Sequence, residues 1–346
     1  MVTIKDVAQK CGVSIAAVSK AMNHQPGVGA EKAEMVIATA REMGYFPNAA
    51  AKTLKTRRSH NIGLLFENGL THEYFSLILD AVRETAEQHQ YDITFLSNQF
   101  TSARGSGYYE HARQRQCDGI LIVQGNYDME GVRRLAASEV PFVSIDQVFN
   151  GRTAIMSENV GSTQEIVEYL HGLGHTRIAF IHGEMGDVTR QRLAGFYRGC
   201  SSCGIEVPDE YVVGARFHEP RDSGLAVRQL LALKQRPTCI LFPDDISYLG
   251  GLTEIEAHGL SVPQDISCFG YDGIHMASVL RPSLATYRQD AAGIGHAAME
   301  NLINAIENPR VYAPEIITIH GCIQPGRTVR DIRETSAAGE KNEAEK

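Results

Sequence analysis

Acidic residues follow several short apolar runs of the chain, at the positions where buried strands would end. Asp146 comes after PFVSI, Asp244 and Asp245 come after TCILF, and Asp272 comes after ISCFGY. A single acid at a strand end is ordinarily a turn or cap residue. Three such ends that converge on one crevice instead indicate oxygen acceptors for a hydroxyl-rich ligand, such as a sugar. Arg192, at the start of a helix after RIAFI, would add a fixed positive charge.

The same residues do not form a pattern typical of catalysis or metal binding. The sequence has no GxSxG, Walker A, HExxH or GxGxxG motif, so we expect no enzyme activity. Seven cysteines are scattered, and Cys200 and Cys203 form a lone CxxC without the second pair that a zinc site normally needs. We therefore expect neither a metal nor a cofactor.

Alternating strands and helices would position these acidic residues. From residue 61 onward, continuous apolar runs alternate with amphipathic segments, which predicts parallel sheets covered on both faces by helices. About 270 residues of this pattern fit two lobes better than one. The expected strands are 61–66, 91–97, 119–123, 141–145, 177–181, 238–242 and 266–271. The expected helices are 74–89, 129–138, 160–173, 190–203, 223–235, 246–258 and 291–307.

The first sixty residues have a different pattern, that of short helices. Residues 4–11 and 15–22 have helical apolar spacing and are separated by a turn at Gly12; a third helix ends at Gly44. Thr3 with Asp6 and Ser14 are the expected helix caps. This spacing is that of a helix-turn-helix, whose second helix presents its first residues to the major groove. Its exposed residues would be Ser14, Ile15, Ala16, Ala17, Ser19 and Lys20.

Charge is divided between these two parts. The whole chain has a net charge of −8, but residues 1–60 hold nine Lys and Arg against four acids, whereas the remainder holds 24 against 37. A basic module on an acidic body is typical of a DNA-binding protein that contacts DNA through that module. No apolar run is long enough for a membrane span, and no signal peptide is present, so we expect a cytoplasmic protein.

The chain resembles the lactose-repressor/galactose-repressor family of bacterial transcription regulators. The resemblance rests on TIKDVAQKCGVSIAAVSKAMN, EMGYFPNAAAKTLKTRRSHNIGLLF, LHGLGHTRIAFI, FGYD and RPSLATYRQD, and it covers residues 2–330. It implies an all-α helix-turn-helix domain (1–47), a hinge helix and linker (48–60), and a two-lobed core like that of periplasmic sugar-binding proteins (61–333). The N-lobe would hold about 61–158 and 291–319, and the C-lobe about 160–288 and 322–333. The polar residues 334–346 should be disordered.

The resemblance also implies which residues contact DNA. Ile15 and Ala16 occupy the main base-reading positions, where apolar side chains discriminate through the thymine methyl group. Leu54 would wedge into the minor groove at the operator centre. Gly29 departs from the Ser that usually caps the third helix. The other implied contacts are Thr3, Ser14, Ala17, Ser19, Lys20, Asn23, Tyr45, Asn48, Lys52 and Lys55.

For the ligand, the resemblance implies contacts at Asp146, Arg192 and Asp272, with Asp244 where many members have Asn. Tyr74 and Phe75 match an aromatic pair near the pocket mouth. A further aromatic usually precedes the glycine at 224 by five residues; here that position is Glu219, and Phe217 lies two residues earlier. We therefore expect ligand contacts at both Phe217 and Glu219.

These features together predict a repressor that binds a pseudo-palindromic operator as a homodimer and is controlled by a small ligand, most simply a sugar. The alternative is a sugar-binding protein without a regulatory role, which would lack the first sixty residues and carry a signal peptide. The sequence leaves open the identity of the effector and whether it induces or co-represses.

Overall fold

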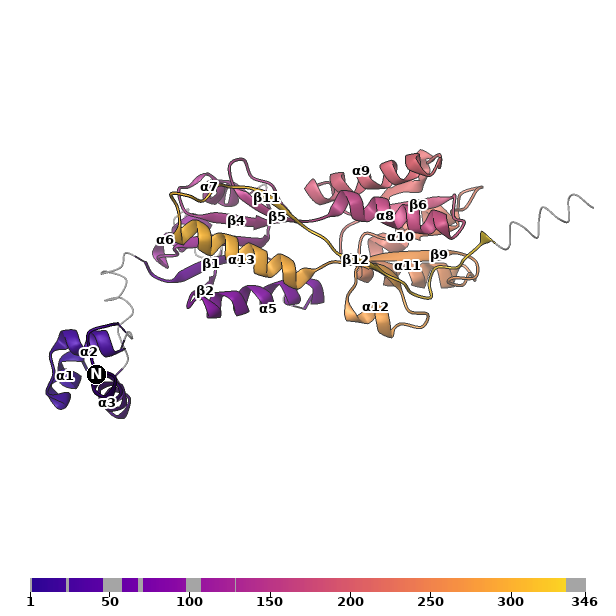
Figure 1. The fold of residues 1–346 in the computed structure, drawn as a ribbon. Coiled ribbons are helices and arrows are strands. Elements are labelled where there is room, and N and C mark those ends of the chain that lie inside the picture. The colour runs from indigo at the N-terminus through magenta and orange to yellow at the C-terminus, as the bar shows by residue number, and fades with distance from the viewer. Residues whose placement is uncertain are drawn as a thin grey trace, which may run out of the picture. The chain divides into compact units, whose positions relative to one another are not determined.

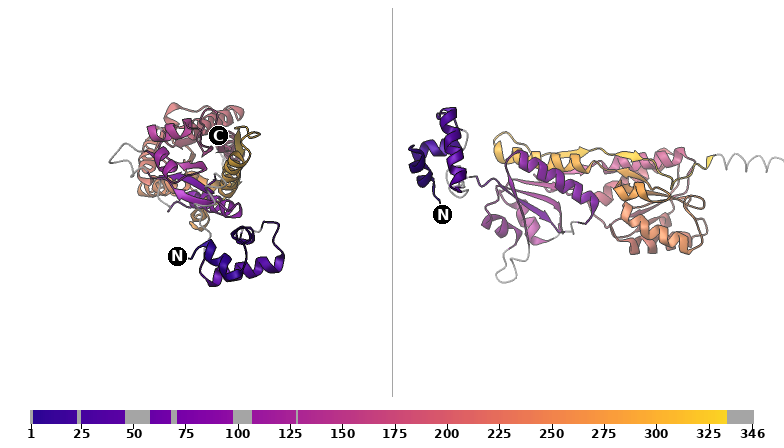
Figure 2. Two further views of the ribbon diagram at one scale, coloured as in Figure 1. Left: turned by 90° about the vertical axis from the view of Figure 1, so that its left-hand side faces the viewer. Right: turned by 90° about the horizontal axis from the view of Figure 1, so that it is seen from below.

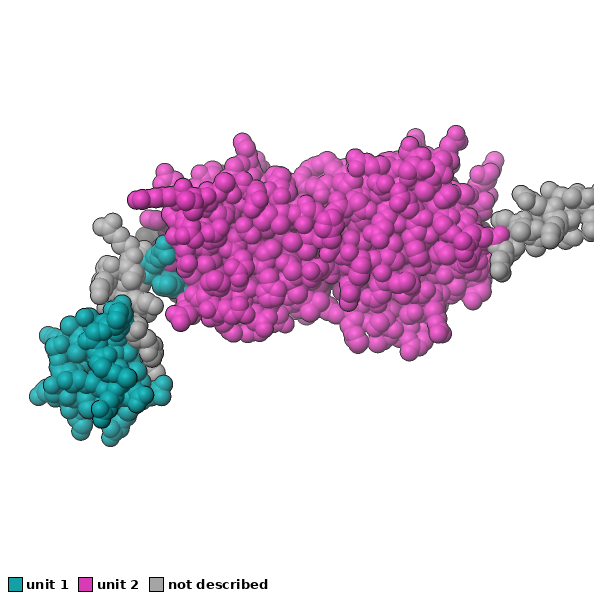
Figure 3. All heavy atoms as spheres, in the orientation of Figure 1, with its two compact units in different colours: residues 1–60 teal, residues 61–346 magenta. Residues whose placement is uncertain are grey.

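The computed structural model describes residues 2–22, 25–45, 58–67, 71–97, 107–127 and 129–333. The chain divides into two compact units, residues 1–60 and residues 61–346 (Figure 3). The tail that we expected to be disordered, 334–346, lies outside the described residues.

The first unit is built from the three helices that the sequence predicted. They are α1 (Ile4–Cys11), α2 (Ile15–Met22) and α3 (Ala30–Glu42). Val7, Val18 and Val36, one from each helix, are fully buried at the centre of its core. Gly12 turns the chain between α1 and α2 in the left-handed conformation (φ 64°), which favours glycine. The helices therefore form the expected helix-turn-helix.

The ends of these helices follow the expected capping chemistry in part. Thr3 donates from its backbone nitrogen and its hydroxyl to the Asp6 carboxylate, each at 2.8 Å. Ser14 Oγ accepts the Ala17 N–H at 3.1 Å at the start of α2. Gly29 begins α3 without a side-chain cap. The start of α2 thus has a side-chain cap that the start of α3 lacks. A fixed first turn is what α2 needs in order to present the side chains of that turn.

The second unit contains two six-stranded sheets, and the first defines the N-lobe (Figure 1). Its strand order is β11-β5-β4-β3-β1-β2, with every neighbouring pair parallel. The strands are β1 (Asn61–Phe66), β2 (Asp92–Phe95), β3 (Gly119–Gln124), β4 (Phe142–Ile145), β5 (Thr153–Ser157) and β11 (Ile316–Ile319).

Helices cover both faces of the N-lobe sheet. On one face α5 (Glu73–Gln88) and α13 (Ala291–Glu307) lie side by side (Figures 1 and 2) and bury the apolar side chains of β1, β3, β4 and β5. On the other face lie α6 (Tyr108–Gln114) and α7 (Glu130–Ala137). This two-sided covering explains why the central strands are almost entirely apolar.

The second sheet defines the C-lobe, with the order β12-β10-β9-β8-β6-β7. All its pairs are parallel except β12, which runs antiparallel to β10. The strands are β6 (Ile178–His182), β7 (Val212–Gly214), β8 (Cys239–Leu241), β9 (Ser267–Asp272), β10 (Ala285–Arg288) and β12 (Cys322–Gln324). The helices are α8 (Asn159–Gly172), α9 (Asp187–Ser202), α10 (Pro220–Leu231), α11 (Asp245–Ala257) and α12 (His275–Val279).

The chain crosses between the lobes three times: after β5, after β10 and after β11 (Figure 1). Each lobe is therefore made from segments that are far apart in the sequence. The predicted fold class, a helix-turn-helix unit with two mostly parallel α/β lobes, is confirmed. Across the described residues, no helix is both long and apolar enough to cross a membrane.

Candidate functional site

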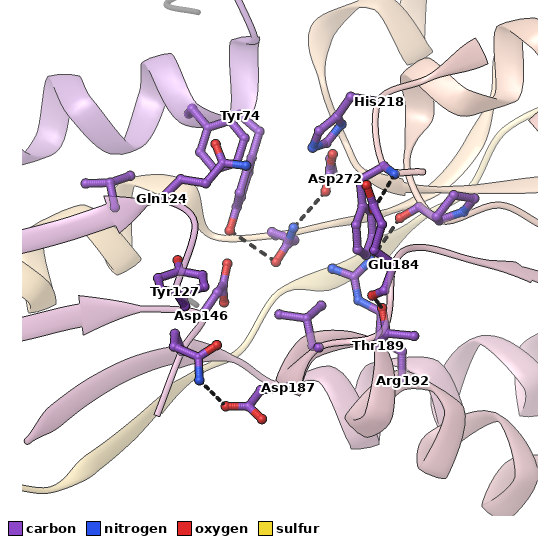
Figure 4. Close-up of a pocket in the computed structure, with 18 residues that line it drawn as sticks. Tyr74, Gln124, Tyr127, Asp146, Glu184, Asp187, Thr189, Arg192, His218 and Asp272 are labelled. Carbon is purple, nitrogen blue, oxygen red and sulfur yellow. Dashed lines mark hydrogen bonds between the residues drawn. The ribbon is translucent and has the colours of Figure 1, made fainter. Parts of the chain in front are cut away.

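A cavity of about 190 Å³ lies between the two lobes of the second unit, where strands of both sheets present their carboxyl ends (Figure 4). Ligands of α/β proteins bind at this position because the loops that follow parallel strands gather there. The polar residues of the lining come from both lobes and from a crossing segment. They are Gln124, Asp146, Gln147, Glu184, Asp187, Thr189, Arg192, His218, Asp272 and Gln289.

Asp146 and Asp272 combine unusual backbones with unsatisfied side chains. Both have positive φ angles, 59° and 106°, in a region that residues other than glycine rarely adopt. Asp146 Oδ1 and Asp272 Oδ2 are buried and accept no hydrogen bond from any described residue. Such strain and unpaired polar atoms persist where the surrounding fold imposes them, and they gather at ligand sites.

The electrostatics of the two carboxyl groups reflect their burial. Burial raises the pKa of Asp146, although the nearby charge of Arg192 acts against this effect. Burial also raises the pKa of Asp272, to about 7, against the opposing charges of His218 and Arg192. A ligand group that donates a hydrogen bond to a carboxyl group in this environment therefore stabilises the complex strongly.

Arg192 supplies the fixed positive charge of the cavity. Its Nε donates to Asn159 Oδ1 and its Nη1 donates to the Pro243 carbonyl, both at 2.9 Å. Its guanidinium carbon lies 3.5 Å from the centre of the Tyr271 ring. Held on three sides, the guanidinium is pre-organised, so little side-chain entropy is lost when a ligand binds.

Aromatic rings form the apolar part of the lining. Tyr74 and Phe75, at the start of α5, face the cavity from the N-lobe with Tyr127, and Phe217 faces it from the C-lobe. The Phe217 ring packs so closely on Gly183 that a Cβ there would lie 2.0 Å from it. Glycine at 183 therefore creates the seat for this ring.

Two residues that we expected to contact the ligand, Glu219 and Asp244, do not line the cavity. Glu219 points toward Arg216, with 3.9 Å between the charged groups, and its side chain is 41% exposed. His218 has a left-handed backbone (φ 56°), which breaks the alternation of an extended segment, and Pro220 then begins α10. Phe217 and His218 consequently face the cavity, and Glu219 does not.

Asp244 also lies outside the cavity lining, directly behind His218. Its carboxylate caps α11 by accepting the Ser247 N–H at 2.7 Å, and it accepts the His218 N–H at 2.8 Å. The His218 side chain lowers the pKa of Asp244 against the effect of burial, and Asp244 in turn raises the pKa of His218. Asp244 therefore orients His218. The neighbouring Asp245 is likewise structural, since it accepts bonds from Thr286 and Ile274.

Hydrogen bonds connect the lobes across the cavity. Tyr74 donates to Gln289 at 3.3 Å, and Gln289 donates to Asp272 at 2.7 Å (Figure 4). On another side, Gln147 of the N-lobe donates to Asp187 of the C-lobe at 2.9 Å. A ligand that contacts these residues would change how the lobes are held together.

Several lining residues escaped sequence reasoning, although some had a usable signal. Gln124 is the last residue of β3, and Glu184 comes two residues after β6. Both therefore satisfy the same rule that identified Asp146, a polar residue at the carboxyl end of an apolar strand. Gln289 follows β10, a strand that we did not predict, so it gave no such signal.

The candidate DNA-contacting residues of the first unit are mostly exposed. Thr3, Ser14, Ile15, Ala16 and Lys20 are exposed, whereas Ala17, Ser19 and Tyr45 are half-buried. Ile15 is 45% exposed, which is unusual for an isoleucine and suits a side chain that contacts a base. Five predicted contacts lie outside the described residues: Asn23, Asn48, Lys52, Leu54 and Lys55.

A helix-turn-helix unit followed by a two-lobed unit with a ligand cavity defines a DNA-binding regulator that responds to a small molecule. The family model for bacterial regulatory proteins of the lacI family matches residues 3–48, and that for the periplasmic binding protein-like domain matches residues 167–329. The chain belongs to the lacI family, as the sequence motifs predicted. It is a transcription regulator and not an enzyme.

Relatives match over almost the whole chain. The transcriptional repressor PurR of Pectobacterium atrosepticum is 32% identical over 96% of this chain and 98% of its own length. The probable repressor ExuR of Bacillus subtilis is 30% identical over 92% of this chain and 95% of its own length. Among solved structures, the lac repressor dimer bound to operator and the anti-inducer ONPF has a TM-score of 0.79 at 25% identity, covering 95% of this chain and 99% of that one. The CelR–cellobiose complex has a TM-score of 0.69 at 21% identity, covering 95% of this chain and 100% of that one. This likeness concerns the fold alone.

Proposed function

We propose that this protein is a repressor that binds a pseudo-palindromic operator as a homodimer and changes its operator affinity when a small sugar binds between its lobes. The observation that carries the effector part is the pair of unsatisfied, buried carboxylates of Asp146 and Asp272, which face one cavity with Arg192. The regulatory part follows from family membership.

Operator reading is assigned to the first turn of α2. Ser14 fixes the start of this helix, and Ile15, Ala16 and Lys20 are exposed on it. Ile15 and Ala16 would contact thymine methyl groups, and Lys20 would add a charged contact. The remaining proposed contacts are Thr3, Ala17, Ser19, Asn23, Tyr45, Asn48, Lys52, Leu54 and Lys55; those outside the described residues rest on the family resemblance.

A small sugar fits the chemistry of the cavity. Four carboxylates line it, those of Asp146, Glu184, Asp187 and Asp272, so acceptors for hydroxyl protons outnumber cations. Aromatic rings supply flat apolar surface for the C–H faces of a sugar ring. The volume of about 190 Å³ is below the roughly 300–1,000 Å³ of drug-sized sites. A single-ring sugar is therefore favoured over a larger ligand.

The homodimer is supported by apolar side chains that remain exposed on the N-lobe. Leu77 of α5 and Phe95 of the edge strand β2 are 46% and 51% exposed. We expect the full-length protein to sediment as a dimer at micromolar concentration, and Phe95→Asp to shift it toward monomer because a charge would then be buried at the interface. A wild-type monomer in analytical ultracentrifugation would contradict this assignment.

The effector assignment is tested by thermal shift of the full-length protein against a panel of monosaccharides, disaccharides and nucleobases. A monosaccharide at about 100 times its Kd should stabilise the protein by roughly 2.7 kcal/mol, which corresponds to a rise in Tm of about 5–10 °C. The same sugar should change affinity for an operator selected from random duplexes, measured by fluorescence anisotropy. Stabilisation by nucleobases alone would contradict the sugar assignment and leave the regulatory role intact.

A further inference from the structure

Three side chains that could bind a metal ion meet at the junction of the two lobes. They are His72, which directly precedes α5 in the N-lobe, His218, which precedes α10 in the C-lobe, and Asp272, at the end of β9. One ligand atom from each lies within 4.8 Å of the other two. We infer that His72, His218 and Asp272 form a Zn²⁺ site that joins the lobes beside the effector cavity.

Asp244 holds His218 in place through its backbone. The His218 N–H donates to Asp244 Oδ2 at 2.8 Å, and Asp244 is itself buried and held by Ser247. The Nδ1 atom of His218 lies 3.5 Å from Asp244 Oδ1 and is buried without a hydrogen bond to any described residue. Histidines that bind metals through one ring nitrogen usually present the other to a carboxylate, so Asp244 is placed to take up one ring nitrogen when the ion binds the other.

His72 faces His218 without a protein partner of its own. The two rings lie 4.0 Å apart between their centres, and both nitrogens of His72 are buried without a hydrogen bond to any described residue. Burying an imidazole in this way is costly unless a bond is made. A metal ion between the two rings and the carboxylate would satisfy one of these nitrogens.

Asp272 supplies the negative charge. The residue is only 6% exposed, and its Oδ2 accepts no hydrogen bond from a described residue, whereas its Oδ1 accepts from Gln289. Figure 4 shows the carboxylate beside the His218 ring. A carboxylate that is oriented through one oxygen and unpartnered at the other is a suitable third ligand.

The ligand set favours zinc, and the ion would link the two lobes. Two imidazoles and one carboxylate with an open fourth position are a common donor set of open zinc sites. Ligand atoms on one tetrahedral Zn²⁺ with bonds of about 2.0–2.1 Å lie roughly 3.3 Å apart, which is within the 4.8 Å that bounds the separations of these three atoms. Since His72 belongs to one lobe and the other two ligands to the other lobe, binding of the ion would hold the lobes together.

The open position faces the effector cavity, because His218 and Asp272 both line it. It would take a water molecule or a ligand oxygen. Sequence reasoning predicted no metal site, because the three residues are separated by 146 and 54 positions and carry no spacing motif. The inference rests on these contacts alone and does not depend on the effector being a sugar.

The test is zinc binding by the full-length, metal-free protein in the absence of any sugar. Isothermal titration with ZnCl₂ should give one Zn²⁺ per chain for the wild type. Both His72→Gln and His218→Gln should weaken Zn²⁺ binding by at least about 100-fold, and Asp244→Asn, which weakens the support of His218 without removing a zinc ligand, by about 10- to 100-fold. His258→Gln is the matched control, since His258 is an exposed histidine beside Glu254, and it should bind like the wild type.

Cobalt separates this site from the cysteines of the chain. Co²⁺ in the wild type should give the visible bands of tetrahedral nitrogen and oxygen ligation, lost in His72→Gln, with circular dichroism showing that the variant stays folded. A thiolate-to-cobalt charge-transfer band would place the ion at cysteines and overturn the inference. Absence of Zn²⁺ binding by the wild type, or unchanged binding by a folded His72→Gln protein, would overturn it equally.

Discussion

Val18→Asp should abolish operator binding while leaving effector binding unchanged. Val18 is fully buried in the small core of the first unit, against Val7 and Val36. A carboxylate there has no partner, and a unit of sixty residues has little stability to lose. The proposed effector cavity is lined only by residues of the second unit, so that unit should fold and bind as before.

The two functions are measured on the same full-length protein, operator binding by fluorescence anisotropy and effector binding by calorimetry. Met35→Asp is the matched control, because it places the same charge on α3 at a side chain that is 42% exposed. This variant should keep the helical signal and the thermal unfolding of the wild type. A loss of effector affinity in Val18→Asp that parallels the loss of operator binding would refute the independence of the two units.

Asp146→Asn should weaken effector binding by roughly 10- to 150-fold, which corresponds to the about 1.5–3 kcal/mol of a hydrogen bond to a charged group. The change keeps the size of the side chain, and asparagine tolerates the left-handed backbone at this position (φ 59°). The loss should therefore come from the missing carboxylate oxygen and not from a distorted fold. Effector-free operator affinity should stay near that of the wild type.

Glu219→Gln makes the same chemical change at a carboxylate that the sequence placed in the site and the structure places outside it. Its effect on effector affinity should stay within about twofold, as for an ordinary surface substitution. Calorimetry with the sugar found by thermal shift measures both variants. Equal losses in the two variants, or a loss in Glu219→Gln alone, would show that the cavity is not the effector site.

Sequence reasoning predicted the long, continuous strands well because their pattern is local. Runs such as those of β1, β3 and β4 are buried on both faces, so apolar residues alone identify them. The strands β7 and β12 have three residues each and are only partly buried. Such short segments carry too little pattern, and their pairing with a neighbouring strand decides their conformation.

The candidate site shows the same limit at the level of single residues. Asp146 and Asp272 could be predicted because each lies at the end of a recognisable strand. Arg192 was expected at the start of a helix and lies instead in its second turn, because α9 begins at Asp187. Whether His218 or Glu219 faces the cavity depends on one left-handed backbone angle and on the start of α10, which the packed lobe determines. The contact between His72 and His218 depends on how the two lobes pack against each other, which no local sequence pattern indicates.

The three crossings between the lobes have a consequence for the order in which the protein is made. The N-lobe begins with β1 at Asn61, yet a large part of its core comes from α13, which begins at Ala291. At the usual 5–20 residues per second, a ribosome needs roughly 10–50 s to synthesise the intervening stretch. During that time the part of the sheet face that α13 covers stays open to water and to other chains. The lobe that is started first is therefore completed only near the end of synthesis, and a nascent or truncated chain that ends before α13 should be a target for chaperones and proteases.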